Sequence, residues 1–219
     1  MKKLVIFDLD GTLLNTIEDL GYAANYALQK HGFPTHSLAS YPYFVGNGVR
    51  RLITRVLPED DRNDSTVATL LKDFKEYYDQ HNTDFTHPYE GIVELLKDLR
   101  ENDIAIAVAS NKYQSAVETI ISHYFGDFEW AAVEGHKEGV NPKPDPSVVF
   151  EILSKVNVAK KEVLYVGDSG VDMETARRAC VDSVGVTWGF RPLKELVENY
   201  ANNIANRPDE ILEYALNAR

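Results

Sequence analysis

Cysteine is almost absent from this chain of 219 residues, because Cys180 is the only one. A single cysteine cannot form an internal disulfide, so a cytoplasmic setting is expected. No apolar run approaches the ~20 residues that a transmembrane helix requires. The apolar run after the N-terminal lysines stops at Asp8, which makes it too short for an export signal. We therefore expect neither export nor insertion into a membrane.

Positive charge is also scarce, since 23 Lys and Arg residues face 34 Asp and Glu residues and the formal net charge is -11. Nucleic acids and anionic membranes bind positive surfaces, so neither is expected as the main partner. A small anionic ligand remains compatible with this charge if a few basic side chains gather at one site. The 44% of hydrophobic residues suffices for a folded core. We expect the protein to be a monomer or a homodimer. Its expected binding partner is a small molecule.

The sequence pattern divides the chain into two units. After Leu14, apolar residues recur at helical spacing as far as about Phe85, and no strand is expected in between. Asn15 or Thr16 is expected to cap the first of these helices, and Ser65 the third. We predict an inserted, all-helical cap domain over residues 15–85 and a core domain over residues 1–14 and 86–219.

From residue 88 onward, expected strands and helices alternate. Continuous apolar runs at 4–7, 104–109 and 163–166 predict strands that are covered on both faces. Weaker strands are expected at 130–133, at 183–187 and near Ile204. This alternation predicts an α/β fold with a doubly wound parallel sheet, in which ligands bind at the carboxyl ends of the strands.

Two carboxylates, Asp8 and Asp10, stand at the end of the first expected strand and project toward the same side of the backbone. At a separation of about 4 Å, their repulsion is on the order of 4 kcal/mol at an effective dielectric near 20. A hard divalent cation such as Mg²⁺ would offset this repulsion. The alternative is a strand that ends in a plain turn, for which Asp-Gly supplies the turn chemistry.

Polar residues also follow the other strong strands. Ser110-Asn111-Lys112 follows the second, Lys143 precedes an expected helix, and Gly167-Asp168 with Asp172 follows the fourth. Each has an ordinary interpretation as a helix cap, a solvated lysine or a turn residue. Their joint occurrence at the ligand-binding edge of one sheet favours a single functional site.

These segments resemble the four motifs of the haloacid dehalogenase-like hydrolase superfamily, with Asp8-Leu9-Asp10-Gly11-Thr12 as the first motif. The resemblance implies that Asp8 is the nucleophile and that Asp10 is the general acid and base. It implies that Ser110 and Lys143 bind the phosphoryl group. Mg²⁺ would be held by Asp8, by Asp168 and by the backbone carbonyl of Asp10.

Four further residues are expected to support this site. Asp172 would either complete the metal shell or fix Lys143, and both alternatives stay open at this point. The main-chain amides of Leu9 and Asn111 would assist in binding the phosphoryl group. Thr12 belongs to the first motif and is expected to have a supporting role.

Substrate recognition is expected in the helical unit, where Gly46, Asn47 and Gly48 precede a helix whose free amides could receive an anion. Arg50 or Arg51 could pair with a carboxylate. The alternative is an ordinary turn between helices, followed by two solvated arginines.

Phosphoglycolate phosphatases resemble this chain in the Gly46–Gly48 segment, in Ser110-Asn111-Lys112 and in Thr187-Trp188-Gly189. This resemblance implies a phosphoric monoester hydrolase that depends on Mg²⁺, acts through an aspartyl-phosphate and takes a small phosphorylated metabolite. The alternatives are a phosphomutase similar to β-phosphoglucomutase, a pyrophosphatase on the same fold, or a non-catalytic phosphate-binding module.

Overall fold

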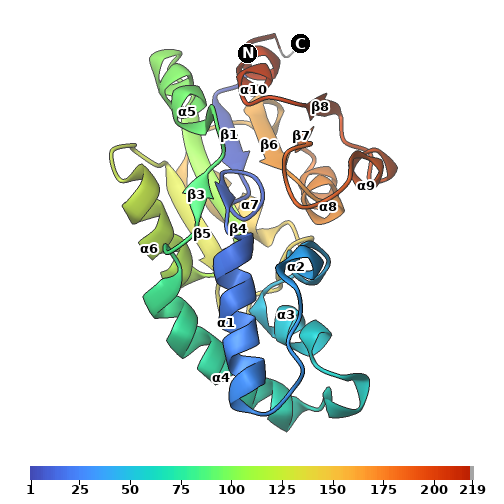
Figure 1. The fold of residues 1–219 in the computed structure, drawn as a ribbon. Coiled ribbons are helices and arrows are strands. Elements are labelled where there is room, and N and C mark those ends of the chain that lie inside the picture. Colours follow the sequence, from blue (N-terminus) through green and yellow to red (C-terminus); the bar gives the residue numbers. More distant parts are fainter. Residues whose placement is uncertain (218–219) are drawn as a thin grey trace.

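A six-stranded sheet forms the centre of the computed structural model, which describes residues 1–217. All neighbouring strands in it are parallel, in the order β5-β4-β1-β6-β7-β8, with β1 between the two halves (Figure 1). The predicted doubly wound α/β sheet is thus confirmed. The strands are β1 (Leu4–Phe7), β4 (Ala105–Tyr113), β5 (Ala132–His136), β6 (Val163–Gly167), β7 (Asp182–Val186) and β8 (Asn203–Ala205).

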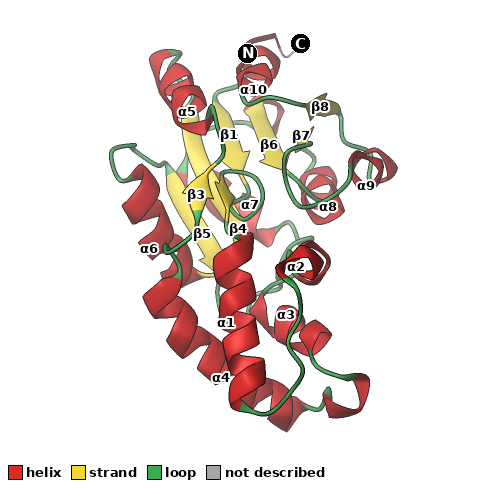
Figure 2. Ribbon diagram, in the orientation of Figure 1, coloured by secondary structure: helices red, strands yellow, loops and turns green. Residues whose placement is uncertain are grey.

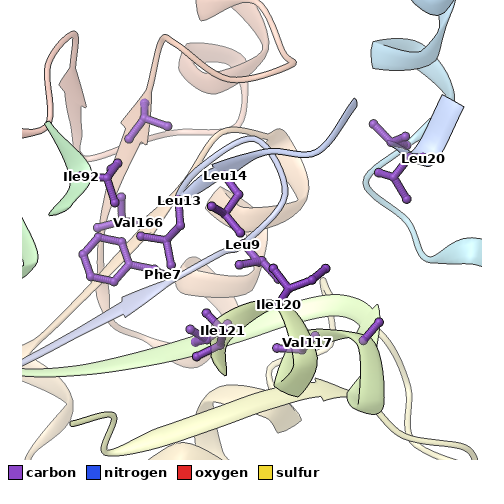
Figure 3. Packing of buried hydrophobic residues seen from close by; sticks show 14 of the residues in the cluster. Phe7, Leu9, Leu13, Leu14, Leu20, Ile92, Val117, Ile120, Ile121 and Val166 are labelled. Carbon is purple, nitrogen blue, oxygen red and sulfur yellow. The ribbon is translucent and has the colours of Figure 1, made fainter. Parts of the chain in front are cut away.

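Helices cover both faces of this sheet, because its strands are apolar on both sides. Val5 and Phe7 of β1 belong to one buried cluster, and Leu4 and Ile6 to another on the opposite face. The first cluster includes residues of α5, α6 and α10, and Figure 3 shows Phe7 packed with its neighbours there. The helices of the core are α5 (Ile92–Glu101), α6 (Gln114–Phe125), α7 (Ser147–Lys155), α8 (Gly170–Ala179), α9 (Leu193–Glu198) and α10 (Asp209–Asn217).

Between Asn15 and His87 the structure contains helices and loops, as predicted (Figure 2). The prediction that Ser65 caps the third helix is wrong, because α4 begins at Asp64 and its N-cap is Asn63. Asn63 accepts a hydrogen bond from the amide of Thr66 (2.9 Å). The α-helices here are α1 (Ile17–Lys30), α2 (Tyr41–Phe44), α3 (Val49–Val56) and α4 (Asp64–His81).

The chain enters and leaves this helical segment side by side. The two-residue strands β2 (Leu14–Asn15) and β3 (His87–Pro88) pair in antiparallel fashion. Asn15, expected within the helical unit, is therefore part of a strand. The short α9 was not expected either. Within residues 1–217, no helix is both long and apolar enough to cross a membrane.

Asp19 is buried in the first turn of α1. It binds the segment just before β3, through which the chain returns to the core. Its carboxylate accepts hydrogen bonds from the amide of Phe85 (3.1 Å) and from the amide (2.9 Å) and hydroxyl (2.7 Å) of Thr86. Hydrogen bonds to a charged, buried acceptor are stronger than those between neutral groups. Asp19 therefore joins the start of the helical segment to its end.

We expect Asp19→Asn to lower the free energy of unfolding by about 1–3 kcal/mol, because the amide group would turn an N–H toward other donors. Urea unfolding followed by circular dichroism would measure this change. Glu18→Gln removes a charge from the same turn without touching these bonds, and should change stability by less than about 0.5 kcal/mol. Similar losses in the two variants would contradict the role of Asp19.

Candidate active site

The carboxyl ends of the central strands bring the predicted residues together. Asp8 directly follows β1, Ser110 lies in β4 next to it, and Asp168 follows β6 on its other side. Lys143 comes from the loop before α7 and is buried at 4% exposure, which excludes the solvated lysine considered from the sequence. One edge of the sheet thus collects side chains from four separate segments.

Lys143 lies between two of the carboxylates. Its ammonium group is 2.8 Å from Asp8 Oδ1 and 2.8 Å from Asp172 Oδ1, and it donates a hydrogen bond to the carbonyl of Ala109 (2.9 Å). Burial opposes its charge, but the charges of Asp172 and Asp8 outweigh that effect and raise the pKa of Lys143 well above its ordinary value. Asp172 thus pairs with Lys143, as one of the two alternatives expects, and the carboxylate cluster described below gives it a place in the other as well.

Asp8 has one occupied oxygen and one free oxygen. Oδ1 accepts a hydrogen bond from the amide of Leu9 (2.7 Å) and faces Lys143. Oδ2 has no partner among residues 1–217, so it can reach a ligand. Burial, followed by the charge of Asp172, raises the pKa of Asp8 to about 7. A further positive charge nearby would favour the ionised form that a nucleophile requires.

Asp168 is buried close to the other two carboxylates. One ligand oxygen each from Asp8, Asp168 and Asp172 lies within 4.8 Å of the others. Burial, followed by the charges of Asp172 and Asp8, raises the pKa of Asp168 well above its ordinary value. The amide of Phe190 donates to Asp168 Oδ2 (2.7 Å), which leaves the other oxygen available.

This donor set fits a hard divalent cation. Three buried carboxylates share a single ammonium group, so the cluster carries excess negative charge in a poorly solvated place. Oxygen ligands at this spacing suit Mg²⁺ or Ca²⁺. The ligand expected from Asp10 is its backbone carbonyl, and the cluster of side chains adds Asp172 to the expected Asp8 and Asp168.

The side chain of Asp10 turns to other partners. Its Oδ1 accepts a hydrogen bond from the hydroxyl of Thr16 (2.8 Å), and its Oδ2 is 3.0 Å from the ammonium group of Lys112. Lys112 in turn donates to the hydroxyl of Tyr78 in α4 (2.9 Å). Asp10 is thereby connected to the helical segment at two points.

The remaining predicted core residues are close by but differ in their contacts. The amide group of the Asn111 side chain donates to the carbonyls of Gly46 (3.2 Å) and Lys143 (3.1 Å). These bonds connect two loops of the site and use the amide group for structure. The Ser110 hydroxyl is buried and accepts one bond, from the amide of Lys112 (3.2 Å). Its proton is free for a ligand. Among residues 1–217, the buried hydroxyl of Thr12 has no hydrogen-bond partner.

A cavity of about 40 Å³ lies between the sheet edge and the helical segment, with Asp8, Asp10 and Ser110 in its wall. Of the residues predicted for substrate recognition, Gly46 and Gly48 line it. The apolar part of the lining comes from the helical segment and consists of Leu20, Val45, Val49, Leu52 and Phe74. Tyr78 of α4 and Asn111, Lys112 and Tyr113 of β4 complete the wall.

The structure does not bring the other three predicted residues to this cavity. Asn47 accepts a hydrogen bond from Arg55 (2.7 Å), Arg50 pairs with Asp64 (2.6 Å), and Arg51 is exposed. The reason is helical geometry: α3 turns Leu52, Ile53 and Val56 inward, so the two arginines lie on its outer face.

The sequence matches the family model of haloacid dehalogenase-like hydrolases over residues 5–186, which is most of the chain. The chain belongs to the haloacid dehalogenase-like hydrolase family. The match begins within the strand that precedes Asp8 and ends with β7, so it includes every carboxylate of the cluster.

Individual members of the haloacid dehalogenase-like hydrolase family are similar over nearly the whole chain. A curated relative named phosphoglycolate phosphatase, from Vibrio cholerae, is 33% identical and covers 94% of this chain and 91% of its own. A crystal structure from Lactobacillus delbrueckii subsp. bulgaricus, which bears that name provisionally, is 32% identical. It has a TM-score of 0.91 and covers 98% of this chain and 99% of its own. A predicted phosphoglycolate phosphatase from Haemophilus somnus has a TM-score of 0.89 at 26% identity, over 97% of each chain.

Sequence reasoning missed several residues at this site of the hydrolase. Lys112 stood in the quoted Ser110-Asn111-Lys112 segment but received no role, and Tyr78 received none in its predicted helix, where it follows Val67, Leu70 and Phe74 at helical spacing. Arg191, which donates to the carbonyl of Val45 (2.9 Å), lies in a loop with no pattern. The polar hydroxyl of Tyr78 on an otherwise apolar stripe was the one available signal.

We expect Mg²⁺ at about 100 times its dissociation constant to stabilise the protein by about 2.7 kcal/mol, because the cation relieves repulsion in the folded state only. This corresponds to an increase of roughly 5–10 °C in Tm, measured by calorimetry. Asp168→Asn should abolish most of this increase. Glu174→Gln, a half-buried acid on α8 outside the cluster, should retain it. An undiminished increase in Asp168→Asn would exclude the cluster as the cation site.

Proposed function

We propose that this protein is a Mg²⁺-dependent phosphatase, which hydrolyses a small phosphate monoester through an aspartyl-phosphate on Asp8. The observation that carries the proposal is the buried Asp8 beside Lys143, with one oxygen held and the other free. Family membership and the name shared by the relatives of known sequence support it. The proposed setting is the cytoplasm, with a small phosphorylated metabolite as the partner.

In the first proposed step, Asp8 Oδ2 attacks phosphorus and the bond to the ester oxygen breaks. Asp10 gives its proton to that departing oxygen. Lys143 and the hydroxyl of Ser110 face the phosphoryl oxygens and stabilise their charge in the transition state. Bound Mg²⁺, held by Asp8 and Asp168, would supply further positive charge against those oxygens.

In the second step, Asp10 takes a proton from water, which attacks phosphorus and breaks the bond to Asp8. Inorganic phosphate leaves and both carboxyl groups return to their starting state. This scheme asks Asp10 to reach a ligand, and in the structure its Oδ atoms contact Thr16 and Lys112 at the wall of the cavity. The helices over residues 15–85 are proposed to act as the cap that closes over the leaving group.

We expect Asp8→Asn to reduce kcat by at least about 10³-fold, because an amide is a poor nucleophile. Phosphate release from p-nitrophenyl phosphate would measure this, with circular dichroism to verify folding. Asp10→Asn should also be slow, yet it should release one burst of nitrophenolate per enzyme. An aryl leaving group needs little protonation, whereas hydrolysis of the aspartyl-phosphate still needs the base. A burst from Asp8→Asn would show that the nucleophile lies elsewhere.

The substrate class follows from a panel that contains 2-phosphoglycolate, hexose phosphates, nucleotides and pyrophosphate, with Mg²⁺ present. We expect the highest kcat/KM for 2-phosphoglycolate, because the cavity is small and the relatives bear that name. An isomerised sugar phosphate in place of free phosphate would identify a mutase. Absence of turnover on the whole panel would favour a non-catalytic phosphate-binding module.

A further inference from the structure

Lys112 is the only positively charged side chain among the described residues that line the cavity. It lies at the end of β4, is buried at 6% exposure, and is covered by Tyr78 from α4. Its ammonium group also lies over the aromatic ring of Tyr78, 4.7 Å from the centroid. A cation at this depth has a specific partner or ligand, since its desolvation is costly.

The contacts of Lys112 leave room for one more. An ammonium group has three N–H bonds, and here one points to the Tyr78 hydroxyl and one contact is made with Asp10. Because the Tyr78 hydroxyl accepts the bond from Lys112, its own proton is free to donate. The hydrogen bonds of the described residues show no other acceptor for the Tyr78 proton or for the third N–H of Lys112. Both residues line the cavity, so they offer two adjacent donors that match the two oxygens of a carboxylate.

The surroundings favour a charged and short ligand. The apolar part of the cavity wall offers an anion no hydrogen bonds, and Asp8 and Asp10 in the same wall repel it, so Lys112 would be its main electrostatic partner. Residues of the helical segment form much of the wall, which favours a short leaving group. Arg50 and Arg51 lie on the outer face of α3 and cannot serve this anion from inside.

We propose that Lys112 and Tyr78 together bind a carboxylate on the leaving group, and so select short phosphorylated acids as substrates. The inference rests on the proposed phosphatase activity. Asp10 is within 3.0 Å of Lys112 and is the proposed proton donor to the ester oxygen. The carboxylate and the ester oxygen must therefore both lie beside Asp10, which a leaving group of two carbons satisfies.

The test compares 2-phosphoglycolate with ethyl phosphate, whose leaving group has the same length but no carboxylate, in steady-state kinetics with Mg²⁺. In Lys112→Met, the ratio of the two kcat/KM values should fall by about 10- to 100-fold, mainly through KM for 2-phosphoglycolate. Tyr78→Phe, which removes only the hydroxyl, should lower the same ratio by about 3- to 10-fold. Lys112→Arg should restore part of it. If Lys112→Met fails to fold, Tyr78→Phe decides the question.

Matched controls are Lys72→Met, an exposed lysine on α4, and Tyr77→Phe, the neighbour of Tyr78 outside the cavity; both should leave the ratio unchanged. If Lys112 only positioned Asp10, both substrates would lose the same factor in kcat, and the inference would be overturned. If the parent protein hydrolysed neither ester, the proposed phosphatase function itself would fail. A fall in the ratio beyond any loss that both substrates share supports the inference.

Discussion

The mutual repulsion of Asp8, Asp168 and Asp172 is the constraint on which the site depends. Buried carboxylates repel one another strongly, and Lys143 lies between two of them. Hydrogen bonds hold all three groups in place, with Asp8 and Asp168 just after strands and Asp172 in α8. The same excess of negative charge would make the cluster receptive to a divalent cation, so that electrostatic strain in the free protein would become affinity for the proposed cation.

The order of the strands explains how distant segments meet. β1 lies between β4 and β6, so Asp8 has Ser110 on one side and Asp168 on the other. The helical segment enters and leaves beside this point through the paired strands β2 and β3. A ligand at the sheet edge is therefore close to both the strand ends and the helices, and a single cavity wall contains residues from both.

The core site could be predicted because the end of a buried strand is visible in the sequence: an apolar run stops and a polar residue follows, as at Asp8 and Asp168. The cavity residues that the helical segment contributes could not be predicted in this way. Arg50 and Arg51 look suited to an anion, but only the packing of α3 reveals that they face outward. The role of Lys112 depends on Tyr78, which is 34 residues away and joins it only in the folded chain. Local patterns contain no information about such a pair.

The two halves of the site have different parts in the proposed recognition. The sheet edge would contact what all phosphate monoesters share, and strands position most of its groups. The cavity would contact what differs between esters, since its wall includes residues of the helical segment. The Asn111 bond to Gly46 and the Arg191 bond to Val45 hold the Val45–Gly46 segment against the core. Any opening of the helical segment would break them and move Tyr78 away from Lys112. Under the proposed function, selectivity for the leaving group would therefore require the closed form, whereas the charge cluster at the sheet edge includes no residue of that segment.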